Sequence, residues 1–154
     1  LKEHQLFEYD DLVAKTDAAT ERFHTLAGDI QQTEAELSRV SDLMAAVVQY
    51  AKTRPAFDGY KAAKYNRKYL AEHEAELADY RAAKATMAEL LGGEKLHKMD
   101  VLKEKRRQLA ARKKALYLEY RKAQQDMREL VAVKGSVDHL RGLTDNQRNK
   151  EQTR

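Results

Sequence analysis

Apolar residues repeat at heptad spacing along the first third of the chain. One set of positions runs from Tyr9 to Ala51 in steps of seven, and a second set runs from Leu12 to Val47 in the same steps. This sustained repeat predicts a coiled-coil helix over residues 9–52. Thr16, Ala19 and Thr33 are the weakest positions of the predicted seam.

Pro55 predicts the end of this helix, because proline disfavours helical geometry at the residue before it. Thr53 is then the expected N-cap of a short new helix. Asn66 is suited to cap a further helix over residues 67–91, which the following pair of glycines ends. We therefore expect residues 53–98 to form a small helical cap inserted after the first long helix.

Helical spacing of apolar residues returns after Asp100, a good N-cap, and continues to about residue 141. This pattern predicts a second long helix over residues 99–142, ended by Gly142. The polar residues 143–154 are expected to fray. Residues 1–8, which do not start with methionine, are expected to be the tail of a preceding element in a longer protein.

The two long segments differ in charge. Residues 1–50 contain four basic and ten acidic residues, whereas residues 51–154 contain 25 basic and 15 acidic residues. Matched lengths, matched apolar repeats and opposite charge favour an antiparallel pair. The expected fold is therefore all-α: an elongated antiparallel helical hairpin, similar to a coiled coil, with a small helical cap at one tip.

The amino-acid composition argues against several kinds of functional site. The 154 residues include no cysteine, so no disulfide or thiolate is available, and no apolar run approaches the ~18 residues that span a membrane. The five histidines are scattered, and Leu77 stands where a zinc-protease helix starting at His73 would need its second ligand. The tyrosines fall mostly at seam or cap positions, where packing is the simpler interpretation. We expect a cytoplasmic protein with no catalytic residue, no metal, no cofactor, no small-molecule substrate and no membrane partner.

Basic residues are the candidate functional residues. One group surrounds the start of the second long helix, and another is interleaved with tyrosines in the cap, a mixture that suits phosphate contact and base stacking. The other interpretation is a solvated surface balanced by the acidic first helix. The candidate nucleic-acid-binding residues are Arg54, Lys61, Lys64, Arg67, Lys68, Lys103, Lys105, Arg106, Arg107, Arg112, Lys113 and Lys114.

Some apolar residues fall outside the seam. They would be buried against a third helix, a second copy of the chain or a further domain, so self-association is also open. These residues are Val13, Leu43, Val48, Leu118 and Val131.

Several segments resemble the C-terminal region of relaxase (mobilization) proteins from mobile elements of Gram-positive bacteria. They are VQYAKTR (48–54), YKAAKY (60–65), YLAEH (69–73), YLEYRKA (117–123), MREL (127–130) and VDHL (137–140). In that family an N-terminal nuclease domain nicks DNA at the transfer origin with a tyrosine and a histidine-bound metal. The nuclease motifs have no counterpart here.

The resemblance implies a non-catalytic accessory module of a DNA-nicking relaxase in conjugative transfer, in the bacterial cytoplasm. Its basic tip would contact DNA, and its partners would be DNA, the relaxosome or type IV transfer proteins. The alternative function is a protein-interaction or oligomerisation coiled coil with no nucleic-acid role.

Overall fold

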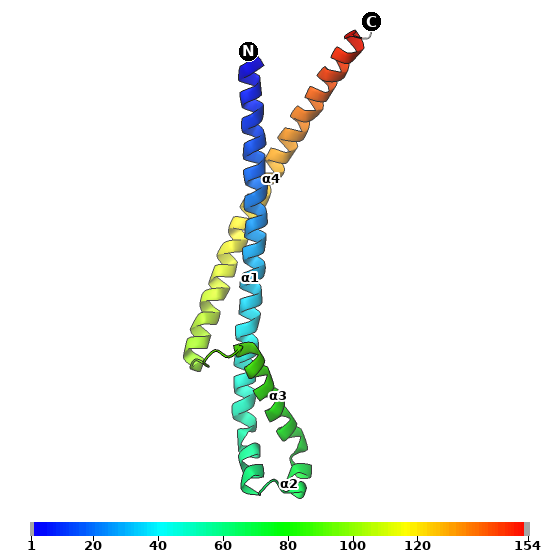
Figure 1. Cartoon of the computed structure of the whole chain (residues 1–154). Coiled ribbons are helices and arrows are strands. Elements are labelled where there is room, and N and C mark those ends of the chain that lie inside the picture. The colour runs from blue at the N-terminus through cyan, green and yellow to red at the C-terminus, as the bar shows by residue number, and fades with distance from the viewer. Residues whose placement is uncertain (1, 153–154) are drawn as a thin grey trace. The chain divides into compact units, whose positions relative to one another are not determined.

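The computed structural model describes the backbone of residues 2–152 and the side chains of residues 8–143, 146 and 150. This part of the chain is all α-helical, with α1 over Lys2–Ala62, α2 over Arg67–Glu72, α3 over Glu74–Leu91 and α4 over Met99–Gln152 (Figure 1). The two long helices, α1 and α4, pack against each other, so the predicted all-α helical hairpin is confirmed. The chain divides into a terminal unit, residues 1–32 and 113–154, and a central unit, residues 33–112.

The terminal unit contains the first part of α1 and the later part of α4. Leu26, Ile30 and Ala123 are buried, and the Phe23 and Tyr120 rings stack with centroids 4.9 Å apart. All five positions belong to the apolar patterns that predict the two long helices. Burial of this apolar surface, at roughly 25 cal/mol per Å², stabilises the pairing of the two helices.

A buried threonine in this seam is satisfied within its own helix. The Thr16 hydroxyl donates a hydrogen bond to the Leu12 carbonyl oxygen at 2.7 Å, and Thr16 is buried. A hydroxyl without a partner in this position would cost about 1–3 kcal/mol. The backbone bond therefore explains how a polar residue is accommodated at a heptad position.

The core of the central unit joins α1, α3 and α4. Val40, Leu43 and Met44 of α1 pack with Leu102 of α4, and Leu90 of α3 lies partly buried against them. Leu43 was predicted to lie outside the seam and to be buried by a further element, and it is buried in this core, against which α3 packs. Val48, Leu118 and Val131 do remain exposed.

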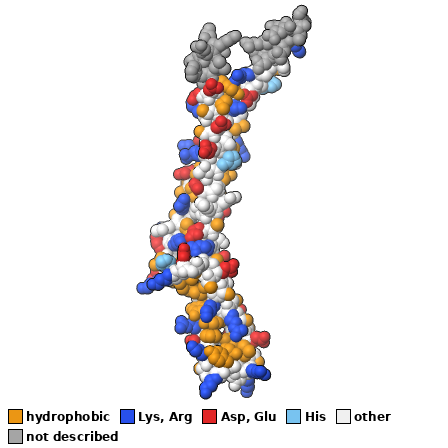
Figure 2. Space-filling view, in the orientation of Figure 1, with side chains coloured by type: hydrophobic (Ala, Val, Ile, Leu, Met, Phe, Trp, Pro, Cys, Tyr) orange, Lys and Arg blue, Asp and Glu red, His pale blue; other side chains and the backbone are white. Residues whose placement is uncertain are grey.

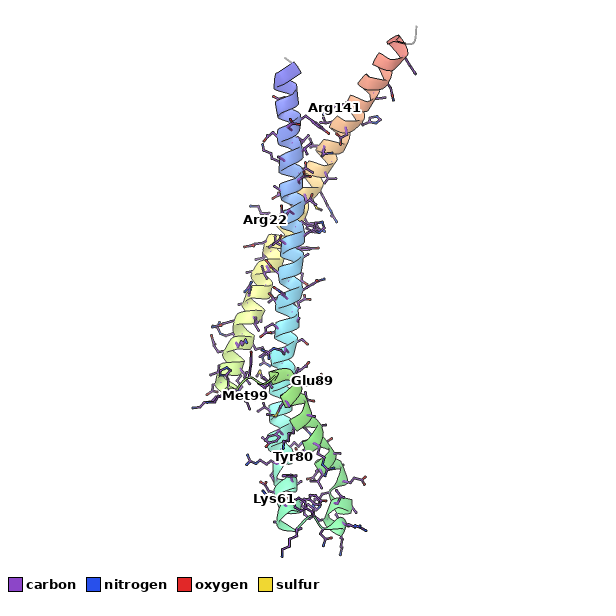
Figure 3. The ribbon with its side chains drawn as sticks, in the orientation of Figure 1. Arg22, Lys61, Tyr80, Glu89, Met99 and Arg141 are labelled. Atoms are coloured by element: carbon purple, nitrogen blue, oxygen red, sulfur yellow. The ribbon has the colours of Figure 1, made fainter. Side chains whose placement is uncertain are left out.

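Beyond the core that joins α1, α3 and α4, the central unit continues as α1 packed against α3 (Figure 1). Leu77 is 1% exposed, and Tyr80 stacks on Tyr50 and Phe57 of α1 with ring centroids 5.1 and 4.4 Å apart. Figure 3 labels Tyr80 between the two helices. These aromatic contacts add to simple area burial, at about 0.5–1.5 kcal/mol per pair.

The predicted end of the first helix at residue 52 is wrong, because α1 continues through Pro55 to Ala62. Proline removes one helical hydrogen bond, but the affected carbonyl belongs to the exposed Ala51, where water can replace the lost donor. Thr53 is not an N-cap: it is buried inside α1, and its hydroxyl donates to the Gln49 carbonyl oxygen at 2.7 Å. The packing of this end of α1 against α3 compensates for the proline.

The structure also changes other predicted ends. Asn66 does cap a helix, accepting from the Lys68 N–H at 2.7 Å, but that helix stops at Glu72, and His73 separates it from α3. Gly92, with φ 55°, ends α3 as expected.

The second long helix begins where the prediction placed it but ends later. It starts at Met99, so Asp100 lies in its first turn, where a carboxylate still favours the helix dipole. Gly142 does not end it: α4 continues to Gln152, because a helical glycine costs only about 1 kcal/mol. Residues 143–152 are therefore helical, and residues 153 and 154 of the expected frayed tail, like residue 1, lie outside the described part of the chain.

Candidate nucleic-acid interface

The turn between α1 and α2 has an unusual backbone. The Lys64 N–H donates to the Lys61 carbonyl oxygen at 3.1 Å, and the Tyr65 N–H donates to the Tyr60 carbonyl oxygen at 2.9 Å. This pair of bonds is the Schellman arrangement that closes many helices. Glycine usually occupies the left-handed position of a Schellman arrangement. Here the left-handed residues are Lys64 and Tyr65, with φ values of 54° and 60°. Left-handed geometry costs a residue with a Cβ roughly 1–2 kcal/mol.

Packing behind the turn holds it in place. Tyr69 of α2 donates a hydrogen bond from its hydroxyl to the Ala56 carbonyl oxygen of α1 at 2.8 Å. The ring passes so close to Gly59 that an added Cβ would lie 2.9 Å from Tyr69 Cζ and would overlap the hydroxyl. Tyr60 is buried beside it, with ring centroids 6.0 Å apart. The turn is therefore braced by α1 on one side and α2 on the other.

Four of the predicted site residues surround this turn. Residues 59–70 contain four basic residues and no acidic residue. Figure 2 shows Lys and Arg side chains around this end of the central unit, beside a patch of hydrophobic side chains, and Figure 3 labels Lys61 there. All four side chains are exposed and form no ion pair with any residue that the structure describes; they are Lys61, Lys64, Arg67 and Lys68. We call these four residues the basic turn.

Arg54 lies on α1 before the basic turn. Its Nε is 3.9 Å from Asp58 Oδ2, in an exposed i,i+4 pair. Such pairs contribute at most a few tenths of a kcal/mol. Arg54 is thus partly neutralised, in contrast to the basic turn.

The basic residues at the start of α4 lie away from the basic turn, so the single basic tip expected from the sequence is wrong. Lys105 Nζ is 3.0 Å from Glu36 Oε1, which places this part of α4 beside residue 36 of α1. Lys61 is 25 residues further along the same helix, a distance of about 38 Å at 1.5 Å per residue. The error arose because α1 was expected to stop at residue 52, which would have kept the cap close to the start of α4.

Lys105 has a structural partner in this position. Glu36 accepts hydrogen bonds from Arg39 and from Lys105, and these hold the pKa of its carboxyl down at about 2. Arg39 also donates to the Leu90 carbonyl oxygen of α3 at 2.9 Å. The group therefore ties three helices together, a role for Arg39 and Glu36 that the helical repeat did not reveal.

The other predicted site residues on α4 are divided between the central and the terminal unit. Arg107 is hydrogen-bonded to Glu104, at 2.9 and 2.6 Å, which lowers the pKa of that carboxyl. Lys103, Arg106 and Arg112 are exposed in the central unit. Lys113, which is partly buried and has an interaction partner, and the exposed Lys114 belong to the terminal unit.

The three tyrosines interleaved with the basic turn differ in access. Tyr60 is 9% exposed, and Tyr69 stacks on His73 with centroids 4.0 Å apart while its hydroxyl bonds α1. Tyr65 is 56% exposed. Of the three rings, Tyr65 is the one available to a ligand. No sequence pattern distinguished it, because its exposure follows from the left-handed turn.

Other kinds of site find no support within the described part of the chain. No group of three or more His, Asp or Glu side chains there is placed to hold a metal ion. None of the helices there has a stretch both long and apolar enough to cross a bilayer. Comparisons with protein-family models, curated proteins and solved structures find no match to this chain.

Proposed function

We propose that this chain is a non-catalytic helical module that binds nucleic acid through the basic turn. The observation behind the proposal is the group of four exposed cations without ion-pair partners among the described residues, held on a braced turn. Nucleic-acid binding at such a surface depends mainly on contacts between cations and phosphates.

The resemblance to relaxase C-terminal regions gives this proposal a setting. In that setting the module serves a DNA relaxase during conjugative transfer, with the nicking chemistry supplied by a separate nuclease domain. The module would hold the DNA, or position the relaxosome on it, through the basic turn.

Binding of the whole chain to labelled DNA, followed by fluorescence anisotropy across about 50–300 mM salt, tests the proposal. Replacing Lys61, Lys64, Arg67 and Lys68 by Gln should abolish most binding and make its salt dependence shallower, because fewer counterions are released. The slope of log affinity against log salt should fall by up to about 3–4, at about 0.7–0.9 for each phosphate that the variant no longer neutralises.

A matched control separates the basic turn from total charge. Replacing Lys103, Arg106, Arg112 and Lys114 by Gln changes the formal net charge of +4 by the same amount. This second variant should retain nearly all of the affinity. Equal losses of affinity in the two variants would show that only net charge matters, and full binding by the basic-turn variant would refute the site.

A protein-interaction role is the second candidate. It is favoured by large apolar side chains of α4 that are half exposed or more, among them Leu118, Val133 and Leu140. At 100° per residue these three lie within about 60° on one side of the helix. Sedimentation velocity of the chain would test self-association, and a monomer at every concentration would count against it.

A further inference from the structure

We infer that Tyr65 is a stacking surface for an unpaired nucleobase, so that the basic turn takes single-stranded nucleic acid. This inference rests on the proposed function and specifies its ligand. It depends on three observations: the free face of the Tyr65 ring, the backbone that holds the ring at the turn, and the cations around it.

The Tyr65 ring has a face open to a ligand. Its one described ring contact is with Tyr60, at a centroid distance of 5.2 Å and an interplanar angle of 83°. A neighbour in this edge-on geometry can cover at most one face of a ring. The exposed fraction of 56% agrees with an uncovered second face. A base could stack there without displacing any side chain of the core.

The backbone that carries the ring is also fixed before any ligand arrives. The Tyr65 N–H bonds the Tyr60 carbonyl oxygen, and Tyr60 is itself buried. Because this backbone is already ordered, binding costs less conformational entropy, and more of the stacking energy contributes to affinity.

A comparison of the ends of α1 and α3 shows that the turn after α1 places residues with a Cβ in a conformation that favours glycine. The end of α3 places Gly92 in the left-handed conformation with φ 55°, and Gly93 follows it with φ 89°. The end of α1 places Lys64 and Tyr65 in the corresponding conformation. Residues held in such strained geometry are concentrated at binding sites. The strain here places a cation and an aromatic ring next to each other at the exposed end of the turn.

This combination fits a single strand better than a duplex. Bases in a duplex already cover one another, and a side chain that stacks on one must first unstack a step at a cost of a few kcal/mol. A single strand offers free base faces and phosphates together, and sites for it combine cations with aromatic rings. An acidic protein surface would use the cations of the basic turn but would leave the ring face unused.

The chain contains no tryptophan, which makes a direct test possible. Tyr65→Trp introduces a single indole at the proposed stacking position. Adding a mixed-sequence DNA strand of about 20 nucleotides should quench its fluorescence, because stacking brings a base against the indole, whereas the matched duplex should quench it much less. Equal quenching by both forms would overturn the assignment.

Affinity measurements on Tyr65→Ala and Tyr65→Phe complete the test. Loss of the ring should weaken binding of the single strand by about 5- to 150-fold, and binding of the duplex by less than about twofold. Tyr65→Phe keeps the ring and should bind both forms like the parent chain. Ala is as strained as Tyr in the left-handed turn, so far-UV circular dichroism should confirm an unchanged fold.

The outcomes separate this inference from the proposed function. If Tyr65→Ala binds the single strand as tightly as the parent chain does, stacking is refuted while phosphate binding by the basic turn stands. Stacking is also refuted if poly-glutamate competes for the basic turn as well as a single strand of equal charge does. If the parent chain binds neither form of DNA at about 50 mM salt, both proposals fail together.

Discussion

The contact between Gly59 and Tyr69 predicts that one common stabilising substitution will have the opposite effect here. Changing a helical glycine to alanine usually stabilises a protein by about 0.5–1 kcal/mol. Gly28 also lies in α1 and has nothing within 4 Å of an added Cβ, so Gly28→Ala should give this gain. At Gly59 the same methyl group would overlap the Tyr69 hydroxyl.

The magnitude at Gly59 follows from what Tyr69 must give up. Moving its ring breaks the hydrogen bond to the Ala56 carbonyl oxygen, which destabilises the fold by about 1 kcal/mol. It also disturbs the stacking on His73 and Tyr60, which contributes about 0.5–1.5 kcal/mol per pair. After the helix-propensity gain of alanine is subtracted, Gly59→Ala should destabilise the chain by about 1 kcal/mol. The two variants should therefore differ by about 2 kcal/mol in the free energy of unfolding.

Urea denaturation followed by far-UV circular dichroism measures this difference. A further variant isolates the cause: with Tyr69→Leu the ring is gone, and adding Gly59→Ala to that background should no longer destabilise. The non-additivity of the double substitution then reports the Gly59–Tyr69 contact. If Gly59→Ala stabilises as much as Gly28→Ala does, the Tyr69 ring does not pack against α1 as described.

Three other contacts predict measurable effects of single substitutions. The pKa of Glu36 is lowered from 4.5 to about 2, so its stabilising effect is present above about pH 4.5 and is lost as pH falls toward 2. Glu36→Gln should flatten the pH dependence of the urea midpoint in that window, by about 1 kcal/mol at most because the pair is partly exposed to solvent; an unchanged profile would contradict the assignment. The pKa of Asp138 is lowered first by Lys134 and then by the Tyr9 hydroxyl, so in an NMR titration Lys134→Gln should raise it more than Tyr9→Phe, and the reverse order would be incompatible with the geometry. Leu77→Ala should cost about 2–4 kcal/mol and Val48→Ala less than about 0.5 kcal/mol in the same urea assay, since the side chains are 1% and 59% exposed; equal costs would disprove the α1–α3 core.

The heptad repeat predicted the pairing of the long helices because it is a local property of each helix. Most seam positions of α1 are buried or half-buried, and Ala51 is an exception. Pro55 led to a wrong prediction of where α1 ends. The energetic penalty of a helical proline is local, whereas the packing that compensates for it comes from another helix. Nothing in residues 50–60 indicates that Tyr80, some 20 residues later, will stack on Phe57 and extend α1 beyond the proline.

The sequence predicted which kinds of residue form the candidate site but not where in the structure they lie. The alternation of cations and tyrosines over residues 59–70 is visible in the sequence. The distance between this segment and Lys105 depends on the length of α1, and the exposure of Tyr65 depends on a left-handed backbone that no propensity favours for tyrosine. Long-range packing decides both.

Exposed ion pairs contribute less to the packing of the two long helices than their apolar cores do. Lys105–Glu36 does join α4 to α1, but Arg54–Asp58, Arg107–Glu104 and Lys134–Asp138 lie within single helices at i,i+3 or i,i+4 spacing. Exposed pairs of that kind are worth about 0.2–0.5 kcal/mol each, so the apolar cores must supply most of the stability. The basic turn takes no part in those cores. Removing its charges should therefore leave the free energy of unfolding nearly unchanged, and this separation of binding from stability is what makes the four-residue Gln variant a decisive test of function.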